Sequence, residues 1–115
     1  MTVTLYGIPN CDSCRKARRW LDDAGIDHAF VDFRADPVND SRLENWAAAL
    51  GWETLLNKRG RTWRELPEEQ KAAVDADEAV ALMRAHPLLI KRPVLEHGTG
   101  VACGFSPARY ASLLS

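Results

Sequence analysis

The chain has 115 residues, of which 46% are hydrophobic and 27% are charged, so its composition is that of an ordinary globular protein and its length suits one domain. Fifteen Lys and Arg against sixteen Asp and Glu leave a formal charge of −1, which does not favour binding to nucleic acid or to an anionic membrane. No apolar run approaches the roughly 18 residues that a bilayer span needs, and the first residues do not resemble a signal peptide. We therefore expect a cytoplasmic monomer with no nucleic-acid or membrane partner.

The N-terminal third predicts a β–α–β unit. Thr2–Tyr6 alternates as a short strand, and residues 7–10 are rich in turn-forming types. A helical period then begins at Cys11 and ends before Gly25, which suits the first position after a helix. His28–Phe33 predicts a second strand, and a strand–helix–strand connection of this length makes the two strands parallel.

The middle of the chain, about residues 41–86, predicts an all-helical insertion. Ser41–Glu44 has the pattern of a capping box, and Gly51 is expected to end the helix that it opens. Pro67 suits a first helical position, and Asp75 can cap a further helix that ends at His86. Between these helices lies a basic segment that is expected to be a loop; it contains Lys58, Arg59, Arg61 and Arg64.

The C-terminal part returns to β structure. Val94–Glu96 and Val101–Cys103 flank a turn with two glycines, which predicts a β-hairpin, and Ser106–Pro107 begins a last helix. The expected fold is therefore mixed α/β: a β–α–β start and a hairpin–helix end around a mixed sheet, with the helical insertion between them.

Cys11 and Cys14 form a C-x-x-C pair where the first strand gives way to a helix. The N–H groups and dipole of a helix N-terminus favour a thiolate, the form that attacks disulfides. Arg15 and Lys16 are expected to favour the thiolate as well, whereas Asp12 opposes it. Cys14, on the same helix face but deeper, is placed to attack a mixed disulfide on Cys11.

Two other interpretations of the cysteine pair stay open at this point. Half a zinc site is one, but zinc usually takes four Cys or His ligands, and only Cys103 and three scattered histidines remain, so we expect no metal. Two buried structural cysteines are the other. The position after a strand and at the opening of a helix favours redox chemistry over both.

A second motif, Ile90–Val94, contains Arg92 and Pro93 just before the third strand. In a redox domain of this topology such a proline is often cis, which lets the backbone pass close to the thiols and meet an extended substrate. Arg92 would then place a cation near Cys11, to stabilise the thiolate or to hold a substrate anion. The alternative is an ordinary trans proline beside a surface arginine.

Four segments together resemble the arsenate-reductase-related, or ArsC/Spx-like, family, and within it the YffB group most. They are Thr4–Cys11, Lys16–Leu21, Gly51–Asn57 and Ile90–Pro93, and the resemblance extends over essentially the whole chain. It implies one thioredoxin-like domain over residues 1–115 with a helical insertion, and it implies that Cys11 is the nucleophile.

The YffB group resembles glutathione-dependent thiol reductases. The implied reaction is attack by Cys11 on a disulfide, followed by release through Cys14 or a second glutathione. Glutathione would be the co-substrate, glutaredoxin a further partner, and no cofactor would stay bound. The residues expected to bind substrate or glutathione are Asn10, Lys58, Arg59, Arg92 and Pro93.

Two other functions occur in the family. Arsenate reductases hold the oxyanion with three arginines, and the matching positions here are Asn57, Arg92 and Gly104, of which only Arg92 is charged. Arsenate reduction is therefore the second hypothesis, because each lost charge-assisted contact weakens binding by roughly 1.5–3 kcal/mol. Spx-like regulators bind RNA polymerase and sense oxidation through C-x-x-C; this is the third, because the chain lacks an extended acidic tail.

Overall fold

The computed structural model describes residues 2–72, 74–98 and 100–114. They form two compact units. The sheet unit combines the chain up to Asp36 with the chain from Arg92 onward, and the helical unit is Pro37–Lys91. The expected organisation as one domain stays a prediction.

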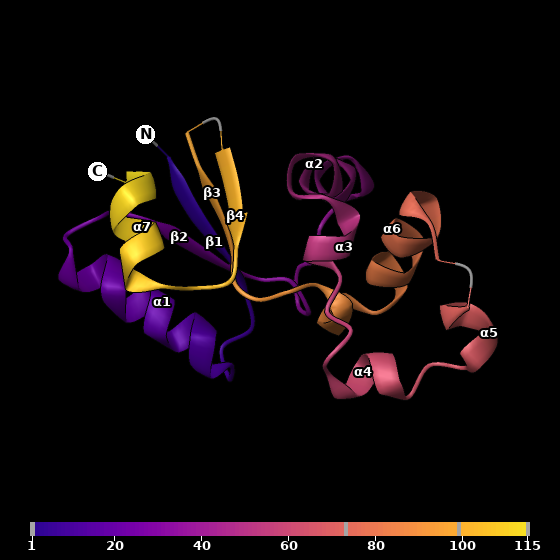
Figure 1. The fold of residues 1–115 in the computed structure, drawn as a ribbon. Coiled ribbons are helices and arrows are strands. Elements are labelled where there is room, and N and C mark those ends of the chain that lie inside the picture. Colours follow the sequence, from indigo (N-terminus) through magenta and orange to yellow (C-terminus); the bar gives the residue numbers. More distant parts are fainter. Residues whose placement is uncertain (1, 73, 99, 115) are drawn as a thin grey trace. The chain divides into compact units, whose positions relative to one another are not determined.

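The sheet unit contains a four-stranded mixed sheet in the order β2-β1-β3-β4 (Figure 1). Strand β1 pairs in parallel with β2 and antiparallel with β3, and β3 and β4 form an antiparallel hairpin. The predicted β–α–β start and C-terminal hairpin–helix are thus confirmed. The elements are β1 (Val3–Gly7), α1 (Asp12–Asp23), β2 (Ala29–Asp32), β3 (Val94–His97), β4 (Gly100–Cys103) and α7 (Pro107–Leu114).

Helices α1 and α7 pack on one face of this sheet, because alternate strand residues point to that face. The contact is a buried cluster of strand residues with one face of each helix; its members are Val3, Leu5, Ala17, Leu21, Leu95 and Tyr110. Helix α1 ends before Gly25, as predicted, and Gly25 has a φ of 70° that few other residues tolerate. There the N–H of Ile26 bonds to the C=O of Leu21, and the N–H of Gly25 bonds to the C=O of Asp22.

The helical unit is built from short helices around buried Leu43, Trp46, Leu55 and Met83. An isolated antiparallel β-bridge pairs Leu56 with Ile90, two residues far apart in this part of the chain. Within the described residues, no helix is both long and apolar enough to cross a membrane. The elements are α2 (Asp40–Leu50), α3 (Trp52–Leu55), α4 (Arg61–Arg64), α5 (Glu68–Lys71), α6 (Ala76–Ala85) and the 3₁₀ turn η1 (Pro87–Leu89).

Three expectations for the helical unit are wrong in detail. The first helix starts at Asp40 with Asn39 as its cap, because the Asn39 side chain accepts from the N–H of Arg42; Ser41 lies inside the helix. Pro67 precedes α5 as its cap instead of opening it. The basic segment is not all loop, since α4 begins at Arg61. The caps at Asp75 and Gly51 and the end at His86 are confirmed.

Candidate active site

Cys11 occupies the N-cap position of α1, in extended backbone and partly exposed. Its C=O already accepts the N–H of Arg15 at 2.9 Å, so the helix begins immediately behind it. As a thiol it makes no side-chain capping hydrogen bond. Its sulfur therefore lies where the helix offers unsatisfied N–H groups to an anion.

The pKa of Cys11 lies below its ordinary value. Burial is the largest single influence and acts to raise it, but four interactions that favour the thiolate outweigh burial. They come from the N–H of Cys14, the thiol of Cys14, the side chain of Arg92 and the N–H of Ser13. The two N–H groups belong to the N-terminus of α1, as the sequence predicts, and Arg92 is the cation among the four groups.

The expected contribution of Arg15 and Lys16 to the Cys11 thiolate is not found, since neither is among the groups that lower the pKa of Cys11. Arg15 pairs with Asp12, its neighbour one turn earlier, through a hydrogen-bonded ion pair. A hydrogen bond from Arg15 also lowers the pKa of the fully exposed Asp12 carboxyl. Since these two side chains offset each other's charge, the cation that acts on Cys11 comes from the segment before β3.

Cys14 differs from Cys11 in its burial and in the direction in which its pKa is shifted. Its side chain is fully buried, and burial is the main cause that raises its pKa to about 11. The charge of Cys11 raises it further. The Cys14 sulfur lies against the end of β1, where a Cβ added to Gly7 would stand only 2.3 Å from it. Gly7 is thus the residue that makes room for the second thiol.

The Arg92–Pro93 peptide bond is cis, in agreement with the prediction for this position. Pro93 is buried, and its C=O accepts a hydrogen bond from the N–H of Gly104 at 2.8 Å. Because proline has no N–H, any backbone N–H donated to a substrate here must come from a neighbouring residue. The half-buried Arg92 is the part of the motif that acts on Cys11.

Asn10 precedes Cys11 and is exposed, and its side-chain oxygen accepts a hydrogen bond from Arg34 at 3.4 Å. Sequence reasoning missed Arg34, which follows β2 and whose N–H bonds to the carboxylate of Asp32. Its position contained a signal, since parallel strands β1 and β2 end at the same edge of the sheet. The structure therefore adds Arg34 to the residues that surround Asn10.

Lys58 and Arg59 belong to the helical unit, and their expected place beside Cys11 stays a prediction. The Lys58 ammonium lies 5.7 Å from the ring centre of Trp52 and 5.4 Å from that of Trp63. The N–H of Arg59 bonds to the side-chain oxygen of Asn57 at 3.0 Å. These residues line a cavity of the helical unit with Glu53, Leu56, Asn57 and Lys91.

Cys103, the third cysteine, is buried at the end of β4. The register places it in one row with Tyr6 and Val94, whereas Leu5 and Leu95 alternate with that row and face α1. Its side chain thus lies on the sheet face opposite to α1. In the parts of the chain that the structure describes, no cluster of three or more His, Cys, Asp or Glu side chains is placed to hold a metal ion.

Comparison with known proteins agrees with this geometry. The model of the ArsC family matches residues 6–113. A solved YffB protein is 46% identical, superposes with a TM-score of 0.96 and covers 99% of this chain and 100% of its own. An arsenate reductase (ArsC) related protein from Brucella melitensis is also 46% identical, with a TM-score of 0.78 over 97% of this chain and 93% of its own. The global transcriptional regulator Spx of Enterococcus faecalis is 30% identical over 90% of this chain and 80% of its own.

The chain therefore belongs to the ArsC family and has its thioredoxin-like fold. The family resemblance read from the sequence is confirmed. The relatives include proteins named as reductases and as a transcriptional regulator, so membership alone does not select one activity.

Proposed function

We propose that this chain is a thiol–disulfide oxidoreductase in which Cys11 is the nucleophile and glutathione is the co-substrate. The observation that carries the proposal is the opposite behaviour of the two thiols: the pKa of Cys11 is lowered, while the pKa of buried Cys14 is raised to about 11. Pairs of titratable groups whose environments separate their pKa values are typical of sites with assigned chemical roles. We place the reaction in the reducing cytoplasm, with glutaredoxin as a further partner.

The first step is thiol–disulfide exchange. The Cys11 thiolate attacks one sulfur of the substrate disulfide, a new S–S bond forms at Cys11, and the other sulfur leaves as a thiolate that takes a proton from water. A glutathione thiolate then attacks the sulfur bound to Cys11 and releases the Cys11 thiolate. The product is a mixed disulfide of glutathione with the substrate, or glutathione disulfide when Cys11 carried glutathione. Two electrons pass from thiols to the substrate disulfide in the full cycle.

The second step can use Cys14 or glutathione, and the burial of Cys14 favours glutathione. A thiol whose pKa is about 11 is almost wholly protonated near neutral pH and attacks slowly. We therefore assign Cys14 an auxiliary role, in which it closes a disulfide with Cys11 when glutathione is scarce.

Glutathione carries two carboxylates, and we assign them to basic side chains that the sequence and structure single out. Arg92 acts on Cys11 and is the first candidate. Lys58 and Arg59 of the helical unit are the second, and their exposed cations suit a flexible anionic ligand. Asn10 and Pro93 complete the proposed glutathione-binding set by lining the approach to Cys11.

The test is turnover of the mixed disulfide between glutathione and 2-mercaptoethanol, with glutathione as reductant. We expect Cys11→Ser to abolish turnover and Cys14→Ser to leave part of it. Cys103→Ser is the matched control, since Cys103 lies on the other sheet face and should keep full activity. Full turnover by Cys11→Ser would exclude the proposal, and complete loss in Cys14→Ser would show that resolution requires Cys14.

Arsenate reduction is the second candidate, favoured by the similarity to an arsenate reductase related protein. Only Arg92 supplies charge at the three positions that match the oxyanion-binding arginines, which argues against tight arsenate binding. Arsenate consumption in the presence of glutathione and glutaredoxin tests this candidate. Binding to the α subunit of RNA polymerase tests the third, which rests on the similarity to Spx.

A further inference from the structure

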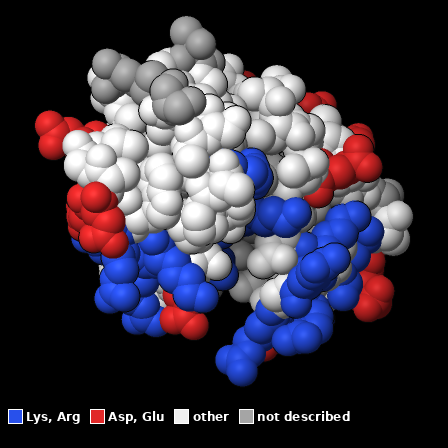
Figure 2. Space-filling view, turned by 60° about the vertical axis from the view of Figure 1, so that its left-hand side comes forward, with Lys and Arg blue, Asp and Glu red and all other residues white. Residues whose placement is uncertain are grey.

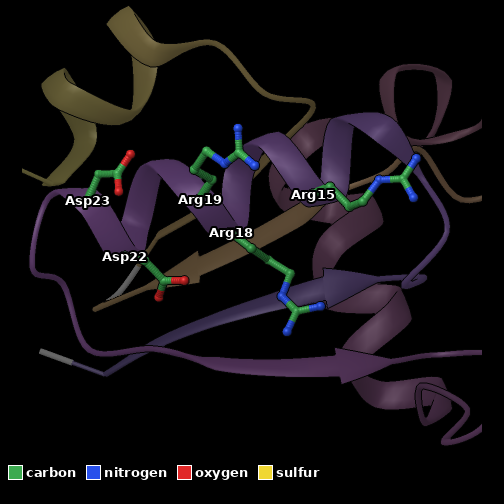
Figure 3. A pocket seen from close by; sticks show the side chains of 5 residues that line it. All are labelled: Arg15, Arg18, Arg19, Asp22 and Asp23. Atoms are coloured by element: carbon green, nitrogen blue, oxygen red, sulfur yellow. The ribbon is translucent and has the colours of Figure 1, made fainter.

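The exposed side of helix α1 has an unusual order of charges. Behind Asp12, the charged residues of α1 through position 19 are all basic and those of the last turn are acidic, as Figure 3 shows for five of them. A helix is stabilised by the reverse order, because its N-terminus is the positive end of the dipole. The residues are Arg15, Lys16, Arg18 and Arg19, followed by Asp22 and Asp23.

Spacing along α1 adds a second unfavourable interaction. Arg15 and Arg19 are four residues apart and therefore neighbours on one face, where like charges repel by a few tenths of a kcal/mol. Nothing in the sheet unit's packing needs this arrangement, since the buried face of α1 is made of Cys14, Ala17 and Leu21. Selection for stability alone would not place these charges in this order.

Contacts within the chain use only part of the positive charge. Arg15 pairs with Asp12, and the Arg18 guanidinium lies 4.3 Å from the ring centre of Phe30. Among the described residues, no carboxylate forms an ion pair with Lys16 or Arg19. Both side chains are exposed, and Arg19 lines two neighbouring surface hollows on α1.

On the face drawn in Figure 2, basic side chains gather in groups, with acidic side chains at their borders. The α1 basic face, defined as Arg15, Lys16 and Arg19, borders the hollow that also includes Asp12. It begins one turn behind Cys11. Arg19 lies eight residues from Cys11, which corresponds to about 12 Å along the helix.

We infer that the α1 basic face docks an acidic peptide segment of the protein whose disulfide Cys11 attacks. The inference rests on the proposed function and adds to it a partner of stated chemistry. An extended chain advances about 3.3 Å per residue, so carboxylates two to four residues from the substrate cysteine would reach Arg15 through Arg19 while its disulfide meets Cys11. Docking would raise the encounter rate of acidic disulfides and would weaken with salt.

An acidic protein segment fits better than nucleic acid. Carboxylates limit the face at both ends, Asp12 at the start of α1 and Asp22 and Asp23 at its end. A short acidic peptide ends within that span, whereas a phosphate backbone continues past it and meets like charge. The total charge of −1 also gives no general attraction for polyanions.

The test uses two symmetrical peptide disulfides that differ only in charge. One has three glutamates beginning two residues from the cysteine, and the other has lysines in their place. The second-order rate of mixed-disulfide formation with reduced protein is measured for each, with 2-hydroxyethyl disulfide as an uncharged reference. The variant is Lys16→Gln/Arg19→Gln, and the control is Arg64→Gln/Arg84→Gln, which removes the same charge from the helical unit.

We expect the wild-type protein to react about tenfold faster with the acidic than with the basic peptide at low salt, and the preference to fall toward twofold at high salt. Lys16→Gln/Arg19→Gln should lose most of the preference and keep its rate with 2-hydroxyethyl disulfide, whereas the control pair should keep both. No preference in the wild type, or a preference untouched by the variant, overturns the docking surface.

Two further outcomes separate this inference from the proposed function. If no protein containing Cys11 attacks 2-hydroxyethyl disulfide, the proposed function fails, and the docking surface fails with it. If all of them attack it but none distinguishes the peptides, only the docking surface fails. Binding of a short DNA duplex that is lost in Lys16→Gln/Arg19→Gln would contradict the assignment to an acidic protein.

Discussion

The sheet unit and the helical unit hold their candidate residues in different ways. Cys11 caps α1, Cys14 lies in the first turn of that helix, and Arg92 lies two residues before the buried start of β3. Lys58 and Arg59 instead lie on irregular chain between α3 and α4, stabilised locally by the side chain of Asn57. Regular elements fix a thiol to within the distances that its chemistry needs, whereas a short loop can adjust to a ligand.

This difference predicts two kinds of effect. Changes to the sheet-unit side chains that act on Cys11, such as Arg92, should alter the reactivity of Cys11 itself. Changes in the helical unit should alter the glutathione concentration at which the protein works, without altering the Cys11 pKa. The predictions that follow can break that division, and they run from the largest expected effect to the smallest.

Gly7→Ala should have the largest effect on the sheet unit. The new methyl would stand 2.3 Å from the buried Cys14 sulfur, so the thiol or the end of β1 must move, at a cost of about 1–3 kcal/mol in the free energy of unfolding. In Cys14→Ala protein the same change should cost less than about 0.5 kcal/mol, because the Cys14 Cβ lies at an ordinary 3.5 Å. Denaturant unfolding of the four proteins measures this coupling, and purely additive costs would contradict the contact.

Arg92→Gln should raise the pKa of Cys11. Since Arg92 is one of the groups that stabilise the thiolate, its loss should move the pH midpoint of alkylation upward. The sign follows because a higher pKa leaves less thiolate at any pH below it. Arg84→Gln, which removes an exposed arginine of the helical unit, is the control and should leave the midpoint in place. An unchanged midpoint in Arg92→Gln would remove Arg92 from the site.

Lys58→Gln/Arg59→Gln should produce the smallest effect. Exposed cations contribute modestly to the binding of an anion, so we expect the KM for glutathione to rise about two- to fivefold with little change in kcat. The alkylation midpoint of Cys11 should not move. A fall in kcat with an unchanged KM would show that the helical unit takes part in the thiol chemistry and would break the division between the units.

Much of the fold could be predicted because its signals are local. Periodicity and turn residues located β1, α1 and the hairpin to within one or two residues. Gly25 correctly marked the C-terminus of α1, and Asp75 the N-terminus of α6. The cap at Asn39 was missed because three successive residues, Asn39, Asp40 and Ser41, are of types that cap helices, and only the first of them precedes the helix. Helix α4 was missed because a single turn with four basic residues nearby has no clear apolar face.

The site could be predicted only where sequence position determines contact. Cys11 at a helix start and the proline before β3 follow from order along the chain. The role of Gly7 could not be predicted, because it depends on how closely α1 approaches β1. Arg15 was expected to act on Cys11, but its pairing with Asp12 depends on side-chain conformation, which periodicity does not fix. Arg34 follows β2, whose end lies beside the end of β1; the order of the strands therefore indicates that it lies near Asn10, but its hydrogen bond to Asn10 depends on side-chain conformation.

The most direct test of the central claim is the pH dependence of alkylation at each cysteine, read separately by mass spectrometry over roughly pH 5 to 10. The lowered pKa of Cys11 predicts that it reacts with a midpoint below the ordinary value for a thiol, and that added glutathione disulfide modifies it. Cys14, with a pKa of about 11, should stay almost unreactive across the same range. A common midpoint for the two thiols at the ordinary value, or earlier reaction at Cys14, would contradict the assignment of Cys11 as the nucleophile.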